Sequence, residues 1–314
     1  MTRESDFISR LRGFATDPAA RGLADDAAIL EVGGTTLVLS HDMIVENVHF
    51  LPGDPPEDVA WKLVAVNLSD LAAKGGRPLG ALLGYTLGDD AWDHAFANGL
   101  EKALGGFGLS LLGGDTVSAP SGTPRVLGLT ALGEATGPVP SRSGAAPGDL
   151  LWVTGSIGDA GAGLHILRGE IEGSPELVER YRRPRPRLEA GRRLSSIATA
   201  MMDVSDGLLI DTWRMAEASG ASLTVDLKLL PLSEALLSAL GDSVETRMAA
   251  ATSGDDYELL FAASADRAPE LLALSDEIGL PISRIGAIGR GDGLRLTAGG
   301  EAIPLPPRLG WEHC

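Results

Sequence analysis

The chain has 314 residues, 44 % of them hydrophobic, which is enough to bury the core of one large domain or of two ordinary ones. Its formal net charge of −17 argues against nucleic acid as a partner. The only cysteine is Cys314, and neither a signal-peptide segment nor an apolar run long enough to span a bilayer is present, so we expect a cytoplasmic protein with no membrane partner.

The first half of the chain alternates helical and strand-like patterns. It begins with an amphipathic helix over residues 7–14, and two strand-like runs separated by Gly33-Gly34 then predict a hairpin at residues 27–40. Beyond the hairpin we expect helices at 59–74 and 92–107 and strands at 78–88, 109–112 and 126–132.

Residues 135–149 are rich in Pro, Gly and Ser and are the best candidate for a domain boundary. We therefore predict an N-terminal domain at residues 1–138 and a C-terminal domain at 139–314. After this boundary we expect strands at 150–154, 223–227, 257–263 and 282–288, a short strand into Asp203, helices from 160, up to 198 and at 207–219, and a charged Arg/Pro segment at 181–187. The fold class is α/β of the α+β type, with two α/β domains.

The positions of the aspartates are the most informative feature of the sequence. Six of them neighbour apolar or small-residue segments: Asp26, Asp42, Asp70, Asp115, Asp203 and Asp206. Carboxylates at strand ends can reach one crevice, where hard oxygen ligands select Mg²⁺ or Ca²⁺. Any one of them taken alone is more often a helix cap or a turn former, so this reading stays open beside the metal site.

Gly113-Gly114-Asp115-Thr116 places two glycines beside a carboxylate, which suits a loop that approaches phosphates. Neither a P-loop motif nor a glycine-rich dinucleotide motif is present. Phosphate binding, if it occurs, therefore uses a different arrangement.

Taken together, the motifs resemble one family. The ordered set DDAAIL, HDMIVENVHF, VNLSDLAAKG, LLGGDT, SRSGAAPGD, VTGSIGDAGAGL, MDVSDGLLID, SGDDYELLF and LGWEH is similar to thiamine-monophosphate kinase, and it runs from about residue 22 to the C-terminus. That family shares a superfamily with aminoimidazole ribonucleotide synthetase and selenophosphate synthetase. The resemblance implies a homodimer whose N-terminal domain strands contribute to a barrel at the dimer interface.

The resemblance also implies roles for individual residues. It implies magnesium binding by Asp26, Ser40, Asp42, Asp70, Asp115, Asp203 and Asp206. It implies ATP contacts at Gly114, Asp115, Arg142 and Ser205, and substrate contacts at His49, Asp255 and Trp311. From the residues alone, a buried and hydrogen-bonded core histidine is the favoured interpretation of His49, and Arg142 in a linker would usually be a solvated residue. Trp311 could simply anchor the C-terminus by packing.

Three positions depart from the family pattern. His41 stands where the family commonly has Thr, Asp255 where it commonly has Glu, and Ala24 where it commonly has Gly. His41 is therefore not among the implied metal ligands, and the reach of Asp255 to a substrate is one methylene shorter.

The implied reaction is transfer of the ATP γ-phosphoryl group to thiamine monophosphate, with several Mg²⁺ ions, giving thiamine diphosphate and ADP. No general base is predicted, because the accepting phosphate is largely ionised at neutral pH. The alternatives are another ATP-dependent enzyme of the superfamily, or a non-catalytic protein that binds divalent cations or nucleotides. Selenophosphate synthetase chemistry would want a reactive cysteine near the N-terminus, where this sequence has none.

Overall fold

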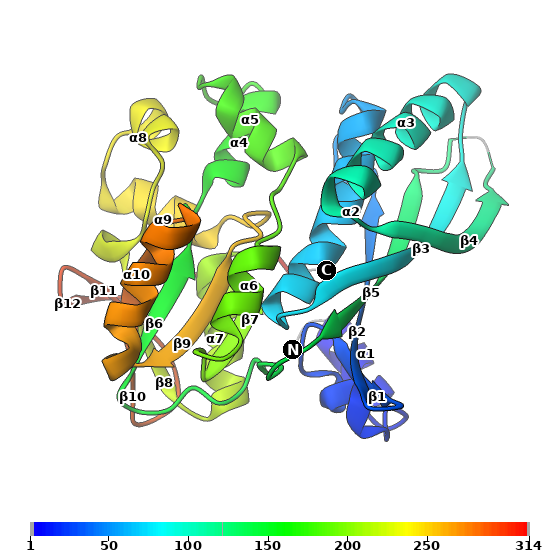
Figure 1. The fold of residues 1–314 in the computed structure, drawn as a ribbon. Helices are drawn as coiled ribbons and strands as arrows, with labels where there is room; N and C mark the ends of the chain where they lie inside the picture. The colour runs from blue at the N-terminus through cyan, green and yellow to red at the C-terminus, as the bar shows by residue number, and fades with distance from the viewer. Residues whose placement is uncertain (1–2, 121, 313–314) are drawn as a thin grey trace.

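A computed structural model describes residues 3–120 and 122–312, and it contains two sheets that lie side by side (Figure 1). Cys314 and the last residue of the LGWEH motif, His313, lie outside the described residues. The segment 136–148 leads from the last strand of the first sheet to the first strand of the second, and the predicted boundary at 138/139 falls in this segment. Among the described helices, none combines the length and the apolar character that crossing a membrane requires.

The N-terminal half carries a five-stranded sheet in the order β1-β2-β5-β3-β4. The predicted hairpin is confirmed, because β1 and β2 pair antiparallel across Gly33-Gly34. The elements of this half are α1 (Arg3–Leu11), η1 (Pro18–Leu23), β1 (Ala28–Val32), β2 (Thr35–Val45), α2 (Pro56–Ala73), β3 (Arg77–Leu87), α3 (Asp90–Phe107), β4 (Ser110–Ser118) and β5 (Val126–Ala135).

Helices α2 and α3 cover one face of this sheet, and the other face is open. Alternate strand residues such as Val38, Tyr85 and Leu129 pack under the helices. By strand register, the residues between them lie on the opposite side. The exposed apolar side chains of that side, which we call the open face, are Leu30, Val32, Met43, Leu82, Leu112 and Val117.

The C-terminal half carries a seven-stranded sheet in the order β12-β11-β8-β10-β6-β9-β7. Its elements are β6 (Asp149–Thr154), α4 (Asp159–Leu167), α5 (Pro175–Arg182), α6 (Leu188–Leu194), β7 (Ala200–Asp203), α7 (Leu208–Ser219), β8 (Ser222–Asp226), η2 (Leu227–Leu229), α8 (Glu234–Leu240), α9 (Val244–Thr252), β9 (Leu259–Ser264), η3 (Ala265–Arg267), α10 (Ala268–Ile278), β10 (Ile282–Gly289), β11 (Gly293–Ala298) and β12 (Glu301–Ile303).

Both faces of this second sheet are covered by helices. Along β6, Leu151 and Val153 join a core with α7, whereas Trp152 joins a core with α6 and α10. This alternation is the period-2 pattern of a strand buried on both sides. The mixed α/β class with two domains is confirmed.

Helix α2 joins the two halves. Its last residues, Ala72 and Ala73, belong to the same hydrophobic core as Leu194 of α6 and Met201 of β7. The approach is close enough that a Cβ at Gly191 of α6 would lie 2.0 Å from the carbonyl oxygen of Ala72. The carboxyl end of α2 is therefore fixed against the C-terminal half, and the acidic residues gather around this junction.

Two details differ from the predicted elements. Asp42 and Asp115 lie inside β2 and β4, because both strands continue past the apolar runs that signalled them. The charged segment 181–187 begins inside α5, where Leu177 and Tyr181 are buried at helical spacing. The many arginines hid this two-residue apolar stripe.

Candidate active site

Three carboxylates from distant parts of the chain meet between the two halves. Asp26 precedes β1, Asp70 lies on α2 and Asp203 ends β7, and one oxygen of each lies within 4.8 Å of the others. Two hydroxyls complete the group. The Ser69 Oγ donates to Asp203 Oδ2 at 2.6 Å, and Ser40 of β2 donates to Asp70.

Asp42 extends this group toward β2. Burial raises its pKa to about 6; His41 opposes the shift, whereas Asp206 and Asp26 add to it. Burial, together with the neighbouring acids, also raises the pKa of Asp70 and of Asp203 well above the ordinary range. We call Asp26, Asp42, Asp70 and Asp203 the acid cluster. Buried carboxylates this close together repel one another when ionised, and their hard oxygen atoms fit Mg²⁺.

Two cations of the chain lie against Asp26. The Lys74 ammonium is 2.8 Å from Asp26 Oδ2 and 2.5 Å from Asp25 Oδ1, and Arg142 donates to Asp26 Oδ1 at 2.5 Å. Arg142 was predicted to contact ATP, and here its guanidinium rests on a predicted metal ligand. Sequence reasoning missed Lys74 and Asp25. A lysine at the end of the apolar pattern of α2 was the available signal for Lys74.

The turn after β7 brings together four predicted site residues. The Asp255 N–H donates to the Ser205 carbonyl and the Trp311 N–H donates to the Asp206 carbonyl, each at 2.8 Å. Asp211 of α7 holds this turn, because its Oδ2 accepts the amides of Ser205 and Asp206 at 3.1 Å each. Sequence reasoning missed Asp211, although an acid within the apolar face of a predicted helix was visible.

A buried lysine connects two of the predicted substrate positions. Lys62 Nζ donates to the His49 carbonyl at 2.9 Å and to Asp255 Oδ2 at 2.8 Å, and it lies 3.9 Å from the Tyr181 ring centre. Asp255 itself has a φ of 70°, an unusual backbone conformation for a residue other than glycine. The His49 Nδ1 accepts the Val45 N–H at 3.0 Å, so the proton of the neutral ring lies on Nε2.

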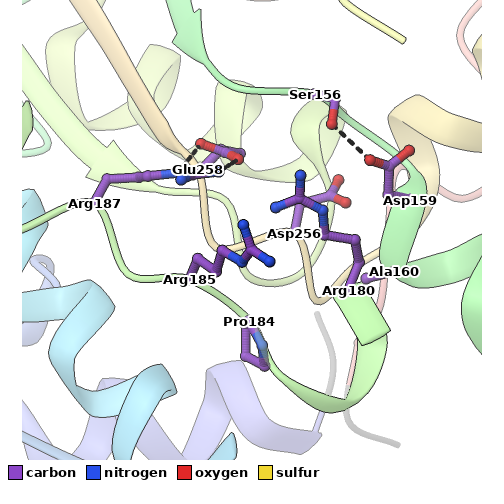
Figure 2. Close-up of a pocket in the computed structure, with 9 residues that line it drawn as sticks. All are labelled: Ser156, Asp159, Ala160, Arg180, Pro184, Arg185, Arg187, Asp256 and Glu258. Atoms are coloured by element: carbon purple, nitrogen blue, oxygen red, sulfur yellow. Dashed lines mark hydrogen bonds and ion pairs between the residues drawn. The ribbon is translucent and has the colours of Figure 1, made fainter. Parts of the chain in front are cut away.

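The loop that carries Asp255 is also fixed by contacts of its neighbours Asp256 and Glu258. Figure 2 shows a small pocket in which Arg187 lies against Glu258, and Arg187 Nε donates to Glu258 Oε2 at 2.7 Å. The neighbouring Asp256 accepts the Gly158 N–H at the start of α4, at 2.9 and 3.0 Å. Glu258 and Asp256 of this loop are thus held by Arg187 and by the Gly158 N–H, whereas Asp255 pairs with Lys62.

Gly114 and Asp115 lie apart from the acid cluster. A Cβ at Gly114 would lie 1.9 Å from the Leu83 carbonyl oxygen, so the pairing of β3 with β4 requires glycine there. By register, Asp115 on β4 lies in line with Gly84, Gly128 and Met43, and three strand spacings separate it from β2, about 14 Å. Within one chain, Asp115 and Asp42 therefore do not share an ion, and the roles predicted for Gly114 and Asp115 stay predictions.

Comparison with known proteins gives consistent matches over both halves. Family models described as AIR synthase related protein match residues 24–135 for the N-terminal domain and 146–299 for the C-terminal domain. Thiamine-monophosphate kinase of Caulobacter vibrioides is 42 % identical over 99 % of this chain and 90 % of its own length. The crystal structure of thiamine-monophosphate kinase from Stenotrophomonas maltophilia K279a is 37 % identical, with a TM-score of 0.79 over 95 % of this chain and 96 % of that chain. AaThiL complexed with AMPPCP and TMP is 28 % identical, with a TM-score of 0.82 over 94 % of each chain.

Proposed function

Since this chain belongs to the thiamine-monophosphate kinases of the AIR synthase related family, we infer that it transfers the γ-phosphoryl group of ATP to thiamine monophosphate. The single observation that carries this inference is the pairing of an ATP analogue with thiamine monophosphate in a structural relative that matches 94 % of the chain. The products are thiamine diphosphate and ADP, and ATP is the co-substrate.

The reaction needs positioning rather than proton transfer. A terminal oxygen of the substrate phosphate forms a bond to the γ-phosphorus, and the bond from that phosphorus to the β–γ bridging oxygen breaks, so that ADP leaves with the electron pair. The second pKa of a phosphate monoester is about 6, so the attacking group is largely ionised at neutral pH and requires no general base.

We propose that the acid cluster, with Ser40 and Asp206, holds the Mg²⁺ ions of this reaction. Bound Mg²⁺ would supply neutralisation of the charge on the two reacting phosphate groups. The chain's own contribution is to fix the carboxylates at one place through β2, α2 and β7, with Ser69 and Ser40 orienting two of them. Asp115 remains a proposed ligand of a further ion at β4.

We propose that Arg142, Ser205 and Gly114 contact ATP and that His49, Asp255 and Trp311 contact thiamine monophosphate. The backbone contacts of Ser205 and Asp206 with Asp255 and Trp311 support this arrangement, because they put the nucleotide and substrate groups on one turn. The resemblance, the single cysteine and the sequence pattern also lead us to propose the cytoplasm as its compartment.

ADP release, measured with and without thiamine monophosphate, tests the function. Release that depends on thiamine monophosphate and yields thiamine diphosphate supports the kinase. Release with another acceptor indicates a different enzyme of the superfamily, and binding of nucleotide without release indicates a binding protein.

Replacing Trp311 by Ala is expected to raise KM for thiamine monophosphate by roughly twofold to thirtyfold, because a stacking or cation–π contact with the thiazolium is worth about 0.5–2 kcal/mol. The KM for ATP should change much less. Steady-state kinetics with each substrate varied in turn would check this, and Trp311→Phe should recover most of the loss. An equal rise in KM for both substrates would mean that Trp311, which is half exposed, only anchors the chain end.

We also propose a homodimer that covers the open face and forms the barrel there. An apolar patch of this kind on a folded surface is typical of an interface between subunits. The six open-face side chains come from β1, β2, β3 and β4, so one contiguous sheet surface would be buried.

Replacing Leu82 by Lys is expected to yield a folded monomer, because a charge at the middle of a buried interface is costly to desolvate. Light scattering after size exclusion would measure the mass. The matched control is Leu272→Lys on α10. Leu272 is similarly exposed but lies off the open face, so this variant should leave the dimer intact. A dimeric Leu82→Lys variant would place the interface elsewhere.

A further inference from the structure

Lys74 is a fully buried lysine at the carboxyl end of α2, and its ammonium group is surrounded by oxygen atoms. It lies 2.5 Å from Asp25 Oδ1 and 2.8 Å from Asp26 Oδ2, and it donates to the Met201 carbonyl at 3.0 Å. Asp26 Oδ2 is buried and has no aligned hydrogen bond from any described residue. Lys74 therefore acts on Asp26 as a charge, at the position that a bound cation would take.

The charges around the site divide it into two corners. Asp25 and Asp26 are neutralised by Lys74, by Arg21 at 2.7 Å and by Arg142 at 2.5 Å.

The other corner carries no such cation. Across residues 3–120 and 122–312, no lysine or arginine forms an ion pair with Asp42, Asp70 or Asp203. Instead, Asp70 accepts a hydrogen bond from the Ser40 hydroxyl and Asp203 accepts one from the Ser69 hydroxyl. Positive charge at the Asp42, Asp70 and Asp203 corner must therefore come from a bound cation, whereas the chain itself supplies it at the Asp25–Asp26 corner.

We propose that Lys74 is a built-in cation of the metal site, which replaces one divalent ion on the Asp25 side of Asp26 and confines metal binding to the side where Asp26 meets Asp42, Asp70 and Asp203. This proposal rests on the magnesium site proposed above. Lys74 is a positioning residue in this account, because it touches Asp25 and Asp26 and acts on the ions through them. A positive charge close to a divalent ion repels it, so removal of the Lys74 charge should open this corner to metal.

The test is Mn²⁺ binding to the nucleotide-free protein, measured from the free Mn²⁺ signal by electron paramagnetic resonance. Lys74→Met removes the charge at similar length, and Lys74→Gln removes it while keeping a hydrogen-bond donor. Each is expected to bind one further Mn²⁺ ion per chain, or to bind Mn²⁺ at least about tenfold more tightly than the wild type. Thermal melting provides a second readout. Without metal, both Lys74 variants should have a lower Tm than the wild type, and Mn²⁺ should raise their Tm by more than it raises that of the wild type.

The matched control is Lys62→Met. Lys62 is a second buried lysine on α2, also paired with an aspartate, but its partner is Asp255 rather than the acid cluster. The Lys62→Met variant should be less stable than the wild type, but the number of bound Mn²⁺ ions and their affinity should be unchanged. Unchanged Mn²⁺ binding and an unchanged Mn²⁺-induced Tm shift in both Lys74 variants would overturn the proposal and reduce Lys74 to a structural ion pair. Wild-type protein that binds Mn²⁺ but does not phosphorylate thiamine monophosphate would overturn the proposed function alone, since metal binding is measured without turnover.

Discussion

Replacing Asp203 by Asn is expected to lower kcat for thiamine monophosphate by about a thousandfold, while the protein stays folded. A loss of this size corresponds to about 4 kcal/mol of transition-state stabilisation. Asparagine has the same shape as aspartate and can still accept the hydrogen bond from Ser69, so the variant removes a charge and little else. Steady-state kinetics at saturating Mg²⁺ and ATP would measure the effect.

The same variant should be more stable than the wild type when metal is absent. The pKa of Asp203 is raised by burial and by Asp26, Asp211 and Asp42, which means that its ionised form is disfavoured in the fold. Removing the charge therefore relieves repulsion. A lower kcat together with a higher metal-free Tm is a combination that a turn former would not give.

Asp226→Asn is the matched control. Asp226 also ends a strand, β8, but its carboxylate accepts the amides of Gly299, Gly300 and Lys228 and so holds a turn. Its loss should lower the Tm and leave kcat unchanged. Near-normal turnover in Asp203→Asn would instead assign Asp203 to a structural role.

The alternation of apolar residues predicted most of the strands and helices, and in β2 it continues into the site. Val38, Ser40, Asp42 and Ile44 occur at period two, and all lie on the helix-covered side of β2. The polar pair was taken as the end of an apolar strand, whereas it is the site-facing part of a longer one. A buried carboxylate inside a strand breaks the usual pattern because function requires it there.

The residues that sequence reasoning missed are those whose partners are distant in the chain. Lys74 meets Asp25 and Met201, which lie 49 and 127 residues away, and Lys62 meets Asp255 at a separation of 193. Only the packing of α2 between the two halves brings these groups together. Composition and local periodicity hold no information on such pairs, whereas the resemblance to a family supplied the acid positions one by one.

The same junction explains why the acids can be held so close. Asp70 is fixed by α2, Asp203 by β7 and Asp26 by the segment before β1, so the free energy of packing three elements opposes the repulsion among three carboxylates. The fold thus stores an electrostatic cost that a bound cation removes.

Mg²⁺ is accordingly expected to raise the Tm, and by more at pH 7.5 than at pH 5. At a hundredfold excess over Kd, binding to the native state alone adds about 2.7 kcal/mol, or roughly 4 °C in a protein of 314 residues. The pH dependence follows from Asp42, whose pKa burial raises from 3.8 to about 6, and from Asp70 and Asp203, whose pKa values burial also raises well above the ordinary value. At pH values between the unfolded pKa and the raised folded pKa of these carboxyl groups, the native state binds more protons than the unfolded chain. Their contribution to the free energy of unfolding is therefore fully present at low pH and is lost as the pH rises through the folded pKa.

Protons and Mg²⁺ compete for the same oxygen atoms, so metal binds best where the carboxylates are ionised. Differential scanning calorimetry with chelator and with Mg²⁺, across pH 5 to 7.5, would measure the difference between the two melting curves. Asp203→Asn should reduce the Mg²⁺-induced shift at pH 7.5, while Asp226→Asn should leave it unchanged. An Mg²⁺-induced shift that is equal at both pH values would mean that the ions bind to exposed acids, whose pKa values are ordinary, and that the acid cluster is not their site.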